Sequence, residues 1–138
     1  MQPEAQSTQE GRSMVWCGNA LVEGAPHHGW FIGHFLEIPH DLRSSHAVEI
    51  KWSTHLAGTQ KQSCGVSEEA TTLCVLIKGQ VSLQFPGREC ILSQEGDYAI
   101  WPAGVPHRWV VVQESLVLTV RWPSVPEAYQ AQVGGSPT

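Results

Sequence analysis

Strand-like composition, turn residues at short intervals and the lack of any helical period predict an all-β protein. Short segments rich in Val, Ile, Leu and Trp recur through the middle of the chain, which is typical of β-strands. Turn residues such as Gly79, Pro86-Gly87 and Gly96 separate these segments. About eight strands at short, regular spacing indicate a closed barrel or a double-sheet jelly roll.

Each strand is expected where an apolar run lies between two turn signals. Pro102, Pro106 and Pro123 then lie at strand ends, where a missing N–H costs the sheet little. The expected strands are residues 30–36, 46–55, 70–78, 80–85, 89–93, 97–101, 107–113 and 115–122.

The length of 138 residues, with 41% hydrophobic and 15% charged residues, predicts one globular domain. We place this domain at residues 14–126, between a polar N-terminal tail at 1–13 and a loose C-terminal tail at 127–138.

A net charge of −5 argues against nucleic acid or an anionic membrane as a partner. No apolar run reaches the roughly 18 residues of a membrane span, and residues 1–13 lack the apolar core of a signal peptide. The cysteines are scattered without a CxxC pair, which argues against a zinc knuckle. Without a secretion signal, we expect them to be reduced thiols in a cytoplasmic protein.

The segment from Gly96 to His107 contains a Pro102-x-Gly104 turn and then a histidine at the start of an expected strand. A β-barrel can present a metal ligand or a general acid/base in this way. The segment resembles the second motif of the cupins. This resemblance implies a cupin-type double-stranded β-helix, the jelly-roll barrel of that family.

The first cupin motif would supply two further histidines and a glutamate. Counting forward from Gly58, the histidine positions fall on Cys64 and Val66, and counting back from Gly79, the glutamate position falls on Thr72. The resemblance therefore implies a degenerate metal site in which His107 is the remaining ligand.

One histidine and one thiol would hold a divalent transition metal weakly, because such sites need three or more donors. Glu68 or Glu69 could contribute if the loop register differs, and His55 or His34 could come from neighbouring strands. No cofactor is assigned, and a divalent transition metal stays an alternative. The candidate metal ligands are His107, His55, Cys64 and Glu69.

The strand at 46–55 has two alternating faces, one with Glu49, Lys51, Ser53 and His55, the other with Val48, Ile50 and Trp52. Either the apolar face packs inward, or the polar face lines a cavity and the apolar face packs elsewhere. The pattern leaves both alternatives open. The candidate catalytic residues are His107, His55, Glu49 and Lys51.

Several aromatic residues are expected close to His107. Trp109 shares its face, and Trp101 precedes the Pro-x-Gly turn. Ordinary barrel packing would explain each tryptophan alone, whereas together they indicate a ligand with a flat apolar or sugar surface. The candidate ligand-binding residues are His107, Trp109, Trp101, Thr72, Cys74 and His55.

Residues 27–124 as a whole are similar to a group of small bacterial and cyanobacterial single-domain cupins of unassigned activity. The segments that carry this likeness are HHGWFIGHF, AVEIKWSTH, ATTLCVLIKG, GDYAIWPAGVPHRW and LTVRWPS. Some of these proteins are labelled signal peptidase I. That activity needs a membrane anchor and a Ser-Met-x-Pro setting for its serine, and Ser13-Met14 lacks the proline.

The resemblance implies a fold and a cavity. Because the first-motif ligands are missing, the first hypothesis is a protein that binds a small molecule in this cavity without catalysis. The alternative is an enzyme, either an isomerase or epimerase with His107 or His55 as acid/base, or a metal-dependent, oxygenase-like protein with an altered ligand set. A homodimer is expected, with residues 27–36 as the contact strand.

Overall fold

The structure, a computed structural model, describes residues 14–59 and 69–126. The expected tails, residues 1–13 and 127–138, lie outside the described residues. The helical elements are the helix α2 (Ala20–Gly24) and the 3-10 turn η1 (Ala25–His27). The strands are β1 (Trp30–Ile32), β2 (Glu49–His55), β3 (Thr71–Phe85), β4 (Arg88–Leu92), β5 (Tyr98–Trp101) and β6 (Arg108–Trp122).

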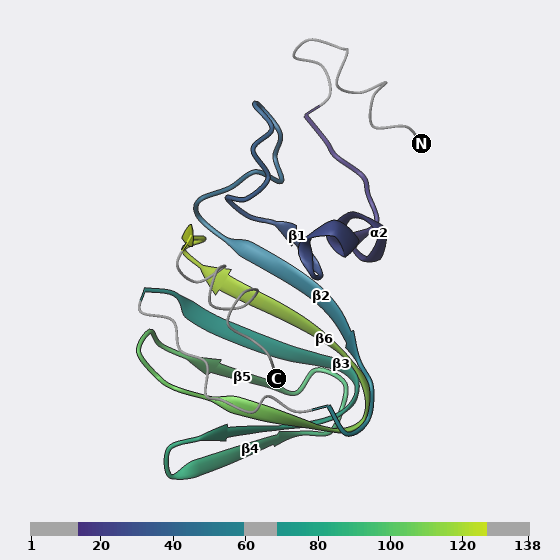
Figure 1. The fold of residues 1–138 in the computed structure, drawn as a ribbon, viewed down its shortest axis with the longest axis vertical. Coiled ribbons are helices and arrows are strands. Elements are labelled where there is room, and N and C mark those ends of the chain that lie inside the picture. Colours follow the sequence, from purple (N-terminus) through teal and green to yellow (C-terminus); the bar gives the residue numbers. More distant parts are fainter. Residues whose placement is uncertain (1–13, 60–68, 127–138) are drawn as a thin grey trace.

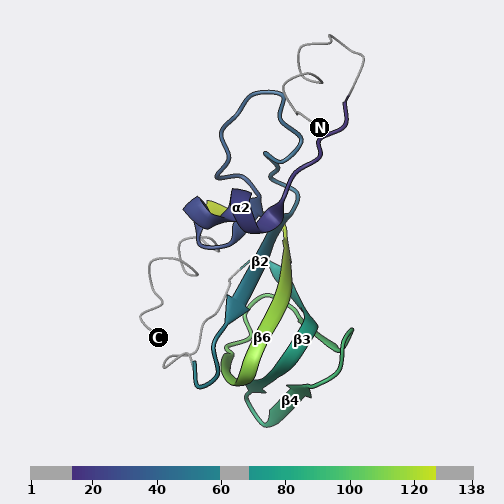
Figure 2. The same ribbon diagram turned by 90° about the vertical axis from the view of Figure 1, so that its right-hand side faces the viewer.

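The strands form one antiparallel sheet in the order β1-β2-β6-β3-β4, and β5 pairs with the free side of the first part of β3 (Figure 1). Helix α2 lies beside β1 and β2 at one end of the molecule (Figure 2). The all-β prediction is confirmed. Apart from Pro126, the described helical residues form α2 and η1, next to the edge of the sheet.

The long strands β3 and β6 bend at their middles, so the sheet folds back over itself (Figure 1). The first half-sheet contains β1, β2 and β5 with residues 71–77 of β3 and 115–122 of β6. The second half-sheet contains β4 with residues 80–85 of β3 and 108–113 of β6.

The expected turn at Gly79 is a bend within one strand. Residues 70–78 and 80–85 join into β3, and residues 107–113 and 115–122 join into β6, with shifts of register between Leu76 and Val81. Gly79 has φ 105°, and a Cβ there would collide with Ser115. Ser115 Oγ accepts from the Gln80 N–H at 2.9 Å and donates to Gln113 O at 2.6 Å. The glycine that predicted a turn therefore lies at a corner of the sheet, where β3 and β6 bend but do not end.

The N-terminal strands are shorter than expected. The predicted strand 30–36 is β1, Trp30–Ile32, with a shift of register between Trp30 and Ile32. The predicted strand 46–55 begins as β2 at Glu49. The chain leaves the sheet after Ile32 because the Gly33 and His34 N–H groups bond to Arg43 O and Ser124 Oγ instead.

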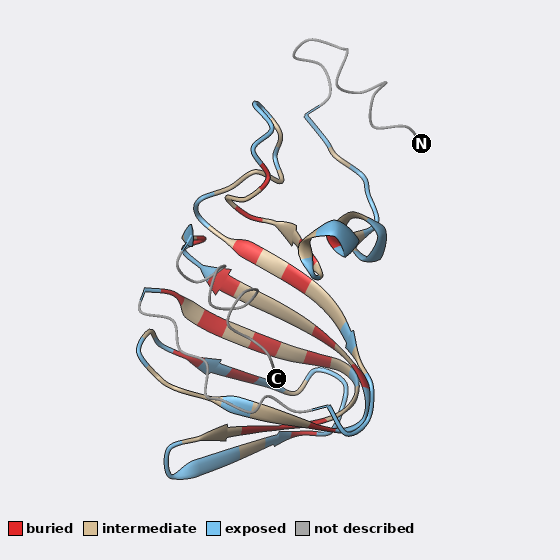
Figure 3. Cartoon of the chain, viewed as in Figure 1, coloured by how far each residue is buried: buried red, intermediate tan, exposed pale blue. Residues whose placement is uncertain are grey.

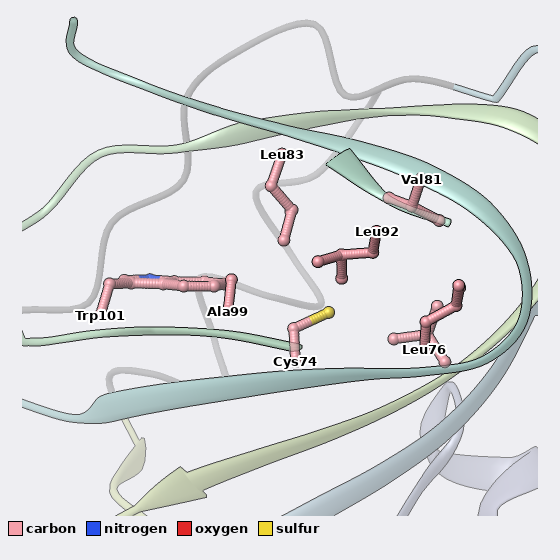
Figure 4. Packing of buried hydrophobic residues seen from close by; sticks show 8 residues of the cluster. Cys74, Leu76, Val81, Leu83, Leu92, Ala99 and Trp101 are labelled. Carbon is pink, nitrogen blue, oxygen red and sulfur yellow. The ribbon is translucent and has the colours of Figure 1, made fainter. Parts of the chain in front are cut away.

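The core lies between the two half-sheets (Figure 4). Burial alternates along β2, β3 and β6, as expected when one side of a strand faces a core (Figure 3). The buried cluster consists of Cys74, Leu76, Val81, Leu83, Leu92, Ala99, Trp101 and Val117. Cys90 packs against it, half-buried, and Cys17, Cys74 and Cys90 are free thiols.

The bend at Gly79 can be tested against a glycine that shares its backbone conformation but not its close contact. We expect Gly79→Ala to lower the free energy of unfolding by at least about 3 kcal/mol, because backbone strain adds to the collision with Ser115. Gly96 has φ 93° and nothing within 4 Å of an added Cβ. Gly96→Ala should therefore cost only the strain, about 1 kcal/mol, in urea titrations. Equal losses would show that the contact with Ser115 does not constrain the bend.

Candidate functional site

The polar face of β2 is directed into the fold. Glu49 is 0% exposed and Lys51 is 9% exposed, whereas Ile50 and Trp52 on the other face are only half-buried. The register places Arg121 and Thr119 of β6 opposite Glu49 and Lys51. Of the two alternatives for this strand, the structure has the one with its charged side chains facing inward.

The same register extends this inner face across β3 and β5. Thr72 pairs with Arg121 and Trp101, and Cys74 pairs with Thr119 and Ala99. Polar groups therefore occupy the β2 and β6 side of the first half-sheet. The apolar cluster begins on β3.

A buried ion pair closes the end of this face. Arg121 Nη1 donates to Glu49 Oε2 at 3.1 Å, and Ser124 Oγ donates to Glu49 Oε1 at 2.8 Å. His34 Nδ1 lies 2.8 Å from Ser124 Oγ and 3.8 Å from Glu49 Oε1. Burial raises the pKa of Glu49, while the Arg121 charge and the bond from Ser124 act in the opposite direction. The contacts join the segment after β1, the start of β2 and the segment after β6, which are far apart in the sequence.

Trp30 lies against both cations of this face and is fully buried. Arg121 Cζ is 4.6 Å and Lys51 Nζ is 5.6 Å from the centroid of its ring, distances at which a cation is attracted to an indole face. Trp30 Nε1 has no hydrogen-bond acceptor among the described residues. Trp30 thus places both cations next to an aromatic wall.

Lys51 acts electrostatically on two of the predicted site residues. Burial raises the pKa of the Cys74 thiol to about 11, against the bond with Thr119 and the charge of Lys51. Burial first, and then the charge of Lys51, lower the pKa of His55 from 6.5 to about 4. At neutral pH Cys74 is therefore a thiol of low reactivity, and His55 is a neutral imidazole.

The remaining predicted residues form two aromatic groups. His107 lies 4.7 Å from Trp101 and 6.4 Å from Phe85 between ring centroids, and Phe85 lies 5.1 Å from Trp101. His55 meets Trp109 edge to face at 4.2 Å. His55 Nε2 also lies 2.8 Å from Ser53 Oγ. The two candidate histidines thus belong to different groups.

The described residues do not form a metal site. Within residues 14–59 and 69–126, no three His, Cys, Asp or Glu side chains come together to hold an ion. Glu69 is exposed, and Cys64 and Glu68 lie outside the described residues. The described donors therefore do not fit a divalent transition metal, which needs three or more.

Arg121, Trp30 and Ser124 were not expected as site residues from the sequence, and His34 was considered only as a possible additional metal ligand. One signal was present, because Arg121 is a lone charge within the apolar run from Leu116 to Trp122. Its partner Glu49 is 72 residues away, and only the register of β2 on β6 brings the two together.

No protein-family profile and no curated protein matches the chain. Solved structures with the same fold are similar to it. KdgF from Halomonas sp. has 18% identity and a TM-score of 0.55, over 59% of this chain and 74% of that one. An RmlC-like cupin from Shewanella frigidimarina has 15% identity and a TM-score of 0.53, over 59% and 70%. A protein with a double-stranded β-helix domain from Klebsiella pneumoniae has 17% identity and a TM-score of 0.52, over 58% and 70%.

The chain therefore has the double-stranded β-helix fold of the cupins, and the predicted fold class is confirmed. Identities at this level show the fold alone. In the part of the chain that the structure describes, no helix has the length and hydropathy needed to span a bilayer.

The low pKa of His55 predicts a pH dependence of stability. The ring has a pKa of about 4 when folded and its ordinary value, 6.5, when unfolded. Because the unfolded state binds more protons between these values, stability should fall as the pH is lowered from 6.5 to 4. We expect a loss of at most about 3 kcal/mol, less where solvent screens the ring. The control is His55→Gln, which cannot titrate; equal pH profiles in urea titrations would contradict the prediction.

Proposed function

We propose that the protein binds a small molecule with an anionic group and a flat apolar body on its inner face. The observation that carries this proposal is Lys51, which is 9% exposed on that face and whose charge influences both Cys74 and His55. A cation in a largely buried position attracts an anionic group more strongly than a cation in water does.

The charges of the described inner face favour an anion. On β2, β3 and β6 these charges are Glu49, Lys51 and Arg121, which sum to one positive charge, and Glu49 is paired with Arg121. A carboxylate or phosphate group that reaches Lys51 would accept charge-assisted hydrogen bonds from its ammonium group.

The aromatic groups support the second part of the proposal. Trp101 and Ala99 of β5 are the cross-strand partners of Thr72 and Cys74 on β3. The ring of His107 packs on Trp101. Together with Trp109 beside His55, these rings offer flat apolar surfaces of the kind that lines ligand sites. The predicted ligand-binding residues His107, Trp109, Trp101, Thr72, Cys74 and His55 stay part of this proposal.

Thermal-shift measurements with aromatic carboxylates and their matched uncharged amides test the proposal. We expect the carboxylates to raise Tm, and Lys51→Met to weaken binding at least about tenfold, since a charge-assisted bond contributes about 1.5–3 kcal/mol. The matched control is Lys78→Met, because Lys78 is an exposed lysine on β3. Amides that bind as well as the acids, or equal effects of the two variants, would contradict the anionic site.

An enzyme is the second candidate, and the state of His55 favours it. A half-buried imidazole that is neutral at pH 7 can accept a proton from a bound molecule, although a pKa of about 4 makes it a weaker base than an ordinary histidine. Analysis of the ligand after incubation separates the two functions. Recovery of the ligand unchanged supports a binding protein, whereas a chemical change that His55→Gln abolishes supports a metal-free isomerase or epimerase.

The donor set also predicts the metal content. Protein purified without a histidine tag and without added metal should contain less than about a tenth of an equivalent of any transition metal, because tight sites need three preformed donors. Elemental analysis by mass spectrometry measures this. A stoichiometric metal that His107→Ala removes would instead support the metal-dependent alternative.

A further inference from the structure

The indole N–H of Trp30 is a buried hydrogen-bond donor that has no acceptor among the described residues. Trp30 is 0% exposed, and a buried N–H group without an acceptor destabilises a protein, so such groups are rare. The carboxylate of Glu49 does not serve as the acceptor, because its oxygens bond to Arg121 and Ser124 instead. The indole N–H is therefore available to an acceptor that the described part of the chain does not supply.

The pairing of β1 with β2 places Trp30 directly opposite Lys51, so that both side chains lie on the inner face (Figure 1). Residues paired in this way have Cβ atoms about 4.5–5.5 Å apart. Gly29 permits the close approach, because it has φ 99° and a Cβ there would lie 2.8 Å from Trp52 O and 3.2 Å from Lys51 Cγ. The Trp30 N–H thus belongs to the face on which we place the ligand.

The ring of Trp30 is polarised in a way that favours an anion at its edge. An aromatic ring has a negative face and a positive edge. Lys51 Nζ and Arg121 Cζ lie over the ring, 5.6 Å and 4.6 Å from its centroid. The cations therefore interact with the face of the ring, while the N–H is at the edge. An anion that accepts from this N–H would also be attracted by both cations.

The charge of the inner face distinguishes between two kinds of anion. Glu49 and Arg121 form an ion pair, and His55 and Cys74 are neutral at pH 7, so with Lys51 the charges sum to one positive charge. A carboxylate carries one negative charge, whereas a phosphate monoester carries about −1.5 to −2 at pH 7. A carboxylate would balance the face. A phosphate would leave excess negative charge in a largely buried position, which is costly.

We propose that the anionic group of the ligand is a carboxylate that accepts hydrogen bonds from Trp30 Nε1 and Lys51 Nζ together. This inference rests on the proposed function and specifies which anion the site selects. A carboxylate has two oxygens, so one can accept from each donor. The flexible stem of Lys51 can move to admit the ligand without a change in the sheet. Trp30 is then a specificity residue, because its N–H adds a hydrogen bond but no charge.

The indole N–H signals of the full chain test the proposal directly. Each of the six tryptophans gives one such signal in a proton–nitrogen NMR spectrum, and the signal that Trp30→Phe removes belongs to Trp30. Naphthoate combines a carboxylate with a flat apolar body. We expect it to move the Trp30 signal downfield, because a new hydrogen bond deshields the proton. Naphthamide, the matched uncharged probe, should leave the signal in place.

Trp30→Phe should lower the affinity for naphthoate at least about tenfold, because it keeps an aromatic ring but removes a charge-assisted hydrogen bond. The matched control is Trp16→Phe. The Trp16 N–H is also buried without an acceptor in the described ranges, but its ring packs on Arg43 and it precedes α2. This control should bind naphthoate as the wild type does. If circular dichroism shows that Trp30→Phe is unfolded, Trp30→benzothienylalanine replaces it, since that residue keeps both rings and has sulfur in place of the N–H.

Two results would overturn the proposal. One is naphthyl phosphate that binds more tightly than naphthoate. The other is naphthoate binding that leaves the Trp30 signal in place and that a folded Trp30 variant does not weaken; if Lys51→Met still weakens binding, the proposed function stands without this inference. Naphthoate that does not bind, or naphthamide that binds equally well, would contradict the proposed function and this inference with it.

Discussion

The close approach of Gly79 to Ser115 determines how the protein is layered. Both long strands bend at this point, and an added Cβ at Gly79 would collide with Ser115. The Ser115 hydroxyl bonds to the backbone of both long strands, at Gln80 of β3 and Gln113 of β6. Because β3 and β6 stay paired as they turn, one sheet supplies both layers. The inner faces of its two halves then enclose Leu76 and Val81.

The inner face is divided between an apolar cluster and a charged end. A buried ion pair is weak evidence for stability, since desolvation offsets most of the attraction. The position of Glu49 and Arg121 is more informative than their charge. Ser124 and His34 connect this pair to the segments that follow β6 and β1. Trp30 packs on Arg121 and Lys51 in the same region. Among the described residues, the buried charged groups of the inner face come from β2 and β6.

The sequence by itself determined the all-β class, most strand positions, and the Pro-x-Gly turn before His107, because these depend on composition and on residues close in the chain. It did not determine that Gly79 lies within a continuous strand, since a glycine at a corner and a glycine in a turn give the same local signal. The direction of Glu49 and Lys51 was also undecided, because both faces of β2 could be covered. Only the register of β2 on β6 decided it, by bringing Arg121 to Glu49 across 72 residues, and pairing between distant strands is set by the tertiary structure.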